Sequence, residues 1–288
     1  MLRGYLRKMR LSKLIALAAI LFSSSLSDTS AENQTMDSYF RHMSSRGVEA
    51  MSGKVGIMEA DAEYSYEFKA FSKLPVKFSL DNKYISIENS SGVELPAHLV
   101  GLSTDVETTL PFLGLDKTYL HLGVSPSFYG EDWDFVSSNF RIPCRSFLVY
   151  LPDEKWTFLA GVAVYPDFER QVFPILGFIY KPNERWAFNI VPKRPSISYA
   201  FNDKVTLFTE GGSSFGEYEV TKDNVKNVVI AYKELHLAAG IKYKVNSFIQ
   251  SSLCAGAIFN RSLKYRDSLG KVNIKDGAYT EIRFIIKI

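Results

Sequence analysis

Apolar and polar residues alternate along most of the chain from residue 54 onward, which is the period of a strand with one apolar and one polar face. The stretch DAEYSYEFKAF (61–71) is an example. Its apolar face holds Ala62, Tyr64, Tyr66, Phe68 and Ala70, and its polar face holds Asp61, Glu63, Ser65, Glu67 and Lys69. The last residues, YTEIRFIIKI (279–288), alternate in the same way. Because chain ends usually fray, a patterned final isoleucine predicts that this end is paired in a sheet.

Thirteen segments with this pattern can be marked, and most have the roughly 9 to 11 residues that a tilted membrane-spanning strand requires. They lie at 57–71, 76–88, 98–111, 117–128, 140–151, 156–165, 172–181, 185–191, 195–202, 204–212, 232–245, 248–258 and 278–288. Bacterial single-chain barrels have even strand numbers, so one segment is misassigned or 76–88 is an outer hairpin. The predicted fold is an all-β, antiparallel up-and-down transmembrane β-barrel of about 12 strands, with about 10 to 14 possible.

Two heptapeptides, YLPDEKW (150–156) and YKPNERW (180–186), predict tight turns. Proline presets the first corner of a type I turn, and the following Asp153 or Asn183 hydrogen-bonds its own backbone. The aromatic residues where the strands leave and re-enter the wall are predicted to form a membrane girdle. They are Tyr150, Trp156, Tyr180 and Trp186. The Gly-rich polar stretches at 213–227 and 260–277 are predicted to be long external loops.

The first thirty-one residues have the composition of a signal peptide. Five Lys or Arg residues precede the apolar run LIALAAILF (14–22), which is too short to span a bilayer, and small residues follow up to Ala31. An N-terminal membrane anchor is the alternative. We therefore predict a signal peptide at 1–31, an N-terminal periplasmic extension at 32–53 and an outer-membrane barrel at 54–288.

Removal of the predicted signal peptide changes the net charge of the chain. Five bases and Asp28 leave with it, so 34 bases and 31 acids become 29 and 30. The remaining bases are scattered, which argues against a nucleic-acid partner. In a closed barrel the first strand pairs with the last, so the polar residues of 61–69 are expected to meet those of the C-terminal strand in the lumen. The predicted lumen charges are Asp61, Glu63, Glu67, Lys69, Glu281, Arg283 and Lys287. Mixed signs in a narrow lumen favour an ion-pair ladder, or a selectivity determinant if water fills it.

Candidate chemistry is sparse. Cys144 and Cys254 lie in strand-like stretches, where two free thiols are favoured over a disulfide, and no His accompanies them as a metal site would require. His98 and His121 lack a following Ser-Asn sequence, so they are expected to lie in the lumen or at an interface. No phosphate loop, metal-ligand spacing or nucleophile elbow occurs. No catalytic residue, cofactor or metal is predicted.

The stretch 173–207, preceded by KWTFLAGVAVYP (155–166), resembles a family of bacterial outer-membrane β-barrel proteins known only as a domain of unknown function. The residues that carry the resemblance are Pro174, Gly177, Tyr180, Pro182, Trp186, Pro192, Pro195 and Tyr199. They are turn and girdle residues, so the resemblance, which extends over about 98–288, implies a fold and a location and no activity.

The predicted function is that of a non-enzymatic outer-membrane barrel, acting as a passive pore or transport protein or as a structural envelope component. A lipid-modifying barrel enzyme and a soluble, secreted β-sandwich binding protein are the alternatives. The expected partners are outer-membrane lipid and the barrel assembly machinery, which would recognise the C-terminal strand; a small-molecule ligand is not indicated by any motif.

Overall fold

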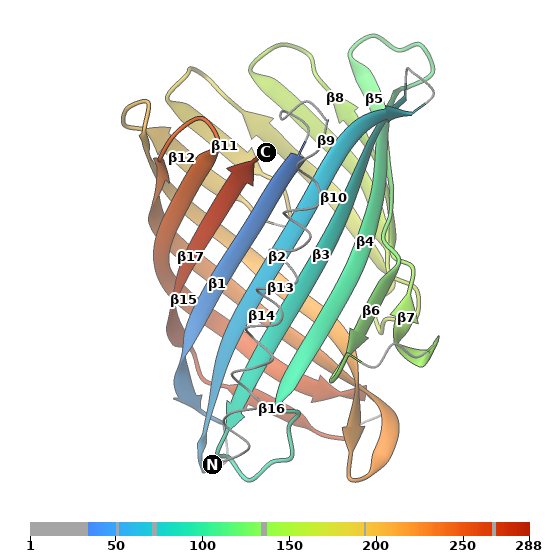
Figure 1. Ribbon diagram of the computed structural model, residues 1–288, viewed down its shortest axis with the longest axis vertical. Helices are drawn as coiled ribbons and strands as arrows, with labels where there is room; N and C mark the ends of the chain where they lie inside the picture. The colour runs from blue at the N-terminus through green and yellow to red at the C-terminus, as the bar shows by residue number, and fades with distance from the viewer. Residues whose placement is uncertain (1–33, 50–51, 71–73, 134–136, 193, 267–268) are drawn as a thin grey trace. The chain divides into compact units, whose positions relative to one another are not determined.

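The computed structural model describes residues 34–288 except 50–51, 71–73, 134–136, 193 and 267–268, and these residues form one closed sheet (Figure 1). Its strands are β1 (Gln34–Gly47), β2 (Lys54–Ala70), β3 (Leu74–Asn89), β4 (His98–Pro111), β5 (Thr118–Val124), β6 (Ser127–Gly130), β7 (Phe140–Arg141), β8 (Cys144–Tyr150), β9 (Trp156–Val164), β10 (Val172–Tyr180), β11 (Trp186–Ile190), β12 (Ser196–Ala200), β13 (Val205–Lys222), β14 (Val225–Lys244), β15 (Ile249–Tyr265), β16 (Lys271–Ile274) and β17 (Gly277–Lys287). A 3-10 turn, η2, spans Ser137–Asn139. None of the described residues forms a helix long and apolar enough to cross a membrane.

The wall of the barrel has 14 strand positions, because β5 with β6, β7 with β8, and β16 with β17 each share one. The predicted antiparallel barrel is confirmed, and the preferred number of about 12 strands is wrong. The segment 76–88 is a wall strand, β3, and not an outer hairpin. Since one sheet closes on itself, the two-sheet sandwich is excluded.

Of the 14 strand positions, the one that the sequence did not predict is β1, which lies between β17 and β2 and closes the barrel. Residues 34–47 are therefore part of the wall, which corrects the predicted extension at 32–53. The prediction failed because the outward row of β1 mixes Ser38 and His42 with Met36 and Phe40, so it does not read as an apolar face. The C-terminal end is paired as predicted: the Ile288 backbone N–H donates to the Gln34 carbonyl at 2.9 Å. The predicted signal peptide lies outside the described residues.

Tight turns join the strands at the end of the barrel where Gln34 and Ile288 lie. Asp153 Oδ1 accepts the backbone N–H groups of Lys155 and Trp156 at 2.8 and 2.9 Å, and Asn183 Oδ1 accepts those of Arg185 and Trp186 at 3.0 Å each. Asn202 and Asn246 make the same pair of bonds in two further turns. The turn chemistry predicted for the two heptapeptides is confirmed.

The opposite end is narrower, because the strands β8 to β12 stop short of it (Figure 1). We call the 14-strand part the wide ring. Beyond it β6 meets β13 directly: Gly130 pairs with Glu219 in parallel, and the Glu131 N–H donates to the Glu219 carbonyl at 2.9 Å. The strands β13, β14, β15, β16, β1, β2, β3, β4 and β6 thus form a second closed ring, which we call the narrow ring.

Both stretches predicted as long loops belong to this narrow ring. The segment 213–227 is strand β13, a turn at Asp223–Asn224 and the start of β14; both turn residues have positive φ (50° and 63°), as a two-residue hairpin turn requires. The segment 260–277 contains the end of β15, all of β16 and the first residue of β17. These predictions are wrong because strands that project beyond an apolar layer need no apolar outer row.

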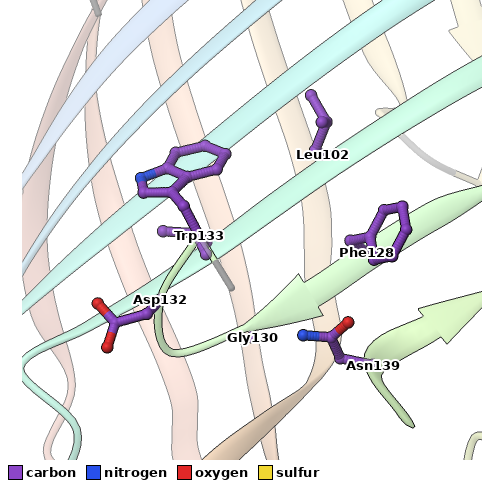
Figure 2. Close-up of a pocket in the computed structure, with 7 residues that line it drawn as sticks. Leu102, Phe128, Gly130, Asp132, Trp133 and Asn139 are labelled. Atoms are coloured by element: carbon purple, nitrogen blue, oxygen red, sulfur yellow. The ribbon is translucent and has the colours of Figure 1, made fainter. Parts of the chain in front are cut away.

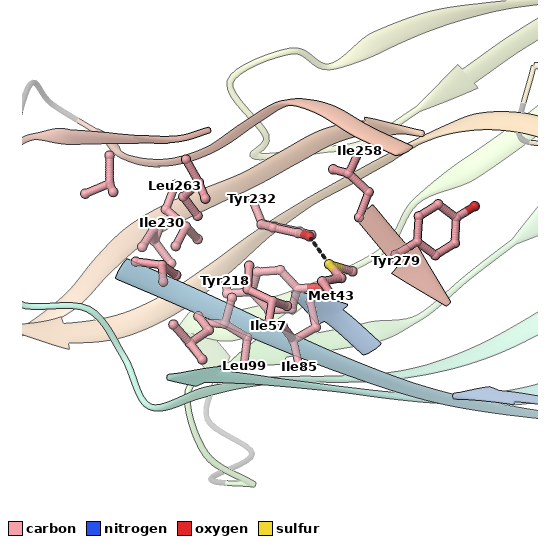
Figure 3. Close-up of a cluster of buried hydrophobic side chains, with 14 of the residues drawn as sticks. Met43, Ile57, Ile85, Leu99, Tyr218, Ile230, Tyr232, Ile258, Leu263 and Tyr279 are labelled. Atoms are coloured by element: carbon pink, nitrogen blue, oxygen red, sulfur yellow. Dashed lines mark hydrogen bonds between the residues drawn. The ribbon is translucent and has the colours of Figure 1, made fainter. Parts of the chain in front are cut away.

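The buried apolar core fills the narrow ring, where side chains from facing walls meet (Figure 3). Ile57, Ile85 and Leu99 from one wall pack with Tyr218 and Ile230 from the other. The Tyr232 hydroxyl lies 3.7 Å from Met43 Sδ at its centre. Of the described residues, β7 to β12 contribute none to this core. The narrow ring is therefore closed along its axis by packed side chains.

Candidate functional site

A layer of buried charges lies next to the apolar core, inside the barrel. Arg41 on β1 is 2% exposed and contacts three carboxylates: Glu281 at 2.7 Å, Glu234 at 3.0 Å and Glu59 at 3.6 Å. Lys83 binds Glu59 at 2.6 Å from β3. The network ties β1, β2, β3, β14 and β17 together across the interior.

Arg194, from the turn between β11 and β12, extends this network to the other side of the barrel. Its guanidinium pairs with both Glu210 and Glu281. Glu210, Cys254 and Glu281 bring three possible metal-ligand atoms within 4.8 Å of one another. Because the Arg194 guanidinium already lies between the two carboxylates, we assign this cluster to an ion pair and not to a metal.

The predicted lumen charges are distributed along both rings, with β1 inserted between the strands expected to touch. Glu63 pairs with Lys77 at 3.4 Å, and Arg283 donates from Nε to Asp37 at 2.6 Å. The predicted direct approach of 61–69 to the last strand is wrong, because the unpredicted β1 supplies Asp37 and Arg41 in between. Asp61 shares the inward face with Glu63. Three of the predicted residues, Glu67, Lys69 and Lys287, are exposed.

The inner face formed by β9 and β10 is largely apolar, whereas the neighbouring β8 turns Arg145 inward to Asp105 and Glu107. Leu159, Ile175 and Ile179 alternate with the outward residues of their strands and are half-buried. The inner wall of the wide ring is thus two-sided, with charges on β1 to β4, β8 and β13 to β17 and mostly apolar side chains on β9 and β10.

The loop between β9 and β10 (165–171) attaches the wide ring to the narrow ring. Phe168 is 5% exposed and packs against Tyr129 and Phe215, with ring centroids 6.1 and 5.7 Å away. Glu169 binds Lys264 at 2.8 Å, and its backbone N–H donates to Glu217 at 2.8 Å. Arg266 donates to the Asp167 carbonyl at 2.7 Å. Nothing in the sequence pattern of this loop distinguishes it from a solvated turn.

The four predicted girdle residues lie on the outward face, next to the tight turns. Trp156 stacks on Tyr180 with ring centroids 4.0 Å apart, and Trp186 packs against Tyr199 at 4.9 Å. Tyr150 stacks on Phe158 at 6.5 Å. The aromatic side chains therefore form a continuous row around this part of the wall.

The two histidines considered for chemistry face opposite sides of the wall. His121 points inward, stacks on Phe147 with centroids 4.4 Å apart, and its Nδ1 lies 3.0 Å from Thr109 Oγ1. His98 points outward, and its Nε2 lies 3.0 Å from Asp132 Oδ1. Both cysteines are free, Cys144 exposed and Cys254 buried.

The outer surface of the described residues includes two hollows. Beside Asp132, Trp133 lies over β4 and encloses a crevice of about 10 Å³ with Leu102, Phe128 and Asn139 (Figure 2). Such a volume holds about one water molecule. A larger hollow of about 500 Å³ lies over β3, β4, β5, β8 and β9. Its lining includes Val76, Val106, Leu122, Val124, Cys144 and Val162, which is an apolar, outward-facing surface.

Comparison with known proteins finds a family match for the central and C-terminal part of the chain. Residues 146–279 match the family described as Domain of unknown function (DUF6268). This match confirms the predicted resemblance to an uncharacterised outer-membrane barrel family, over a shorter stretch than 98–288. No curated protein matches the sequence.

Several solved barrels are similar in structure at low sequence identity. The COG4313 outer membrane channel from Pseudomonas putida F1 is 12% identical, with 90% of this chain and 96% of that chain covered and a TM-score of 0.48. The TodX monoaromatic hydrocarbon channel deltaS2 mutant is 10% identical, with 92% of each chain covered and a TM-score of 0.47. The NanC porin is 8% identical, with 88% and 100% covered and a TM-score of 0.41. At these identities no activity is transferred from them.

Proposed function

We propose that this protein is an integral outer-membrane β-barrel, closed along its axis at the narrow ring, that passes a small solute and does no chemistry on it. The observation that carries the membrane assignment is the belt of exposed apolar side chains around the wall. It includes Phe158, Val162, Leu176, Leu237, Ile241, Leu253, Ile282 and Phe284. A soluble monomer rarely exposes so large an apolar surface.

The tight turns give the orientation. Outer-membrane barrels have short periplasmic turns, so the turn end of the wide ring faces the periplasm and the narrow ring faces outward. The aromatic row around Trp156 and Trp186 then lies at the periplasmic headgroup level. Export by the signal peptide at 1–31, insertion by the barrel assembly machinery through β17 and contact with outer-membrane lipid belong to the same proposal.

The closed state is supported by the packed core of the narrow ring and by the Arg41 network beside it. An apolar core from which water is excluded blocks ions along the barrel axis. Transport therefore requires side chains to separate, in contrast to a permanently open porin.

The test is conductance in planar bilayers, after gel mobility with and without boiling has shown a folded barrel. We expect almost no steady current for the unmodified protein and discrete openings for the Ile57→Gly/Ile230→Gly variant, which removes facing core side chains. A large steady conductance of the unmodified protein would contradict the closed state. Release of the protein by a urea wash of membranes would contradict the membrane assignment.

An enzyme is the second candidate, because His98 and Asp132 form a hydrogen-bonded pair on the outer face and Ser86 is opposite His98 in the β3–β4 ladder. The adjacent crevice is too small for a lipid, which favours the non-enzymatic function. A phospholipid ester hydrolysis assay separates the two. Hydrolysis that is lost in His98→Gln would establish the enzyme, and absence of hydrolysis in the unmodified protein would exclude it for this substrate class.

A further inference from the structure

The ladder of the wall is interrupted between β10 and β13. On the β11 side, β10 pairs through Phe178–Tyr180, and within the described part of the chain 172–177 have no ladder partner there. On the side that faces β12, strand β13 pairs with β12 through Thr206–Glu210. Beyond Gly211, the next described pair along this edge is the one between Glu219 and β6. Among the described residues, 212–218 of β13 therefore have no ladder partner along that edge. These two facing edges, 172–177 and 212–218, are the seam.

The seam lies at membrane depth, because the hairpin below it is too short to cross the bilayer. Strands β11 and β12 have 5 residues each, whereas a transmembrane strand requires about 9 to 11. The ends of β11 and β12 at Ile190 and Ser196 therefore lie within the apolar layer, where Arg194 turns inward to its carboxylates.

Backbone groups without partners are costly in hydrocarbon, unless they are buried in protein or line a water-filled space. The edge residue Pro174 reduces this cost, since proline has no N–H to leave unpaired.

Aromatic side chains close the seam in place of backbone hydrogen bonds. Phe173, from the inner face of β10, lies 5.8 Å from Phe215 on the outer face of β13, so the end of β10 overlaps β13. Tyr165 packs on Phe173 at 5.4 Å. Each phenylalanine ring also carries a cation, Arg170 at 5.0 Å and Lys233 at 5.1 Å. These contacts can separate by side-chain rotation while every ladder bond of the barrel remains intact.

The chemistry on either side of the seam indicates what would pass. On the lumen side, the adjacent inner wall is the apolar face with Ile175 and Ile179, opposite the charged half of the ring. On the outer side, the exposed Val172 and Leu176 of β10 flank the seam. The edge of β13 begins with Gly212, Ser213 and Ser214, whose small side chains leave little bulk at this point. An apolar route therefore runs past Val172 and Leu176 and between the two phenylalanine rings, with the cations of Arg170 and Lys233 on the rings as the charges at its margin.

We propose that the seam between β10 and β13 is a lateral gate, through which an uncharged apolar solute passes between the barrel interior and the outer leaflet of the membrane. The proposal rests on the proposed function, since it requires the barrel to be in a bilayer. It explains how a barrel whose axis is closed by the narrow ring can still carry a solute. Phe173 and Phe215 are the gate side chains.

The experiment locks the seam reversibly. In a Cys144→Ser/Cys254→Ala background, Phe173→Cys/Phe215→Cys is treated on Gram-negative cells with a bis-methanethiosulfonate of short spacer, and uptake of N-phenyl-1-naphthylamine is followed by fluorescence. The matched control is Phe78→Cys/Val106→Cys, which are exposed and directly paired in the intact β3–β4 ladder. We expect the seam cross-link to reduce uptake to the level of cells without the protein, reduction to restore it, and the control cross-link to have no effect.

Three outcomes would overturn the gate while leaving the barrel in place. These are unchanged uptake after complete seam cross-linking, uptake no higher than in cells without the protein, and an equal fall in the permeation of raffinose, which would indicate an aqueous axial path. Anomalous gel mobility before boiling, measured for each variant, verifies that it is a folded barrel. Recovery of the protein outside the membrane fraction would refute the proposed function itself.

Discussion

The narrow and wide rings of this barrel are stabilised differently, although they share nine strand positions of the sheet. The narrow ring has a dry apolar core, with Ile57, Ile85, Leu99 and Ile230 all at or below 1% exposure. The wide ring has half-buried ion pairs and an apolar inner face, and its exposed apolar belt needs lipid. The narrow ring thus resembles a small soluble barrel in its packing, whereas the wide ring depends on its ladder and on the bilayer.

Removal of Arg41 should give the largest loss of stability. In Arg41→Met the buried carboxylates Glu59, Glu234 and Glu281 lose their shared cation, and breaking a buried pair in this way costs about 3–5 kcal/mol. The loss of unfolding free energy is measured by guanidinium denaturation in detergent micelles. The control is Arg283→Met, whose pair with Asp37 is part-exposed and should cost clearly less. Equal losses would mean that burial of charge does not differ between the layer beside the apolar core and the more open part of the wide ring.

Truncation of a side chain in the core of the narrow ring should give the second-largest loss of stability. Ile230→Ala removes a fully buried side chain and should destabilise the barrel by about 2–5 kcal/mol. The matched change in the wide ring, Ile179→Ala, affects a half-buried residue and should cost less. The same denaturant series reports both. If Ile179→Ala were the more harmful, the inner face of the wide ring would be a packed core and the proposed route along it would be blocked.

Loss of the hydrogen bonds in a turn of the wide ring should reduce the free energy of unfolding less than truncation of Ile230 or Ile179. Asn183→Ala removes the acceptor of two backbone N–H groups at an exposed turn, a loss of about 1 kcal/mol for a solvated site. Asn183→Asp keeps the acceptor and is the control. Refolding yield into lipid, read from gel mobility, adds a kinetic readout. A loss in Asn183→Asp equal to that in Asn183→Ala would show that the side-chain acceptor is irrelevant.

The difference between the rings also explains what the sequence could predict. Period-two patterning identified every strand position of the wide ring except β1, because lipid demands an apolar outer row, and proline with Asp or Asn identified two of its turns. Strand β1 and the extensions of β13 to β15 were missed because their outer rows carry Ser, Gly, Lys and His. The Arg41 and Arg194 networks depend on strand register and on which walls face each other. Neither property can be predicted from the local spacing of residues in the sequence.

The smallest predicted effect is a pH-dependent attachment between the two rings, made by Glu169 of the β9–β10 loop. Hydrogen bonds from Lys264 lower the pKa of Glu169 below its usual value of 4.5. Because the folded pKa is the lower one, the attachment contributes fully above the unfolded pKa and is lost as pH falls through the folded value. Both side chains are part-exposed, so the pair is worth at most about 1 kcal/mol.

Hydrogen exchange of residues 165–171, corrected for its intrinsic pH dependence, should therefore accelerate under acid conditions in the unmodified protein. In Glu169→Gln it should already be fast at neutral pH and stay so. A flat profile in the unmodified protein would show that Phe168 packing alone holds the loop of the wide ring on the narrow one.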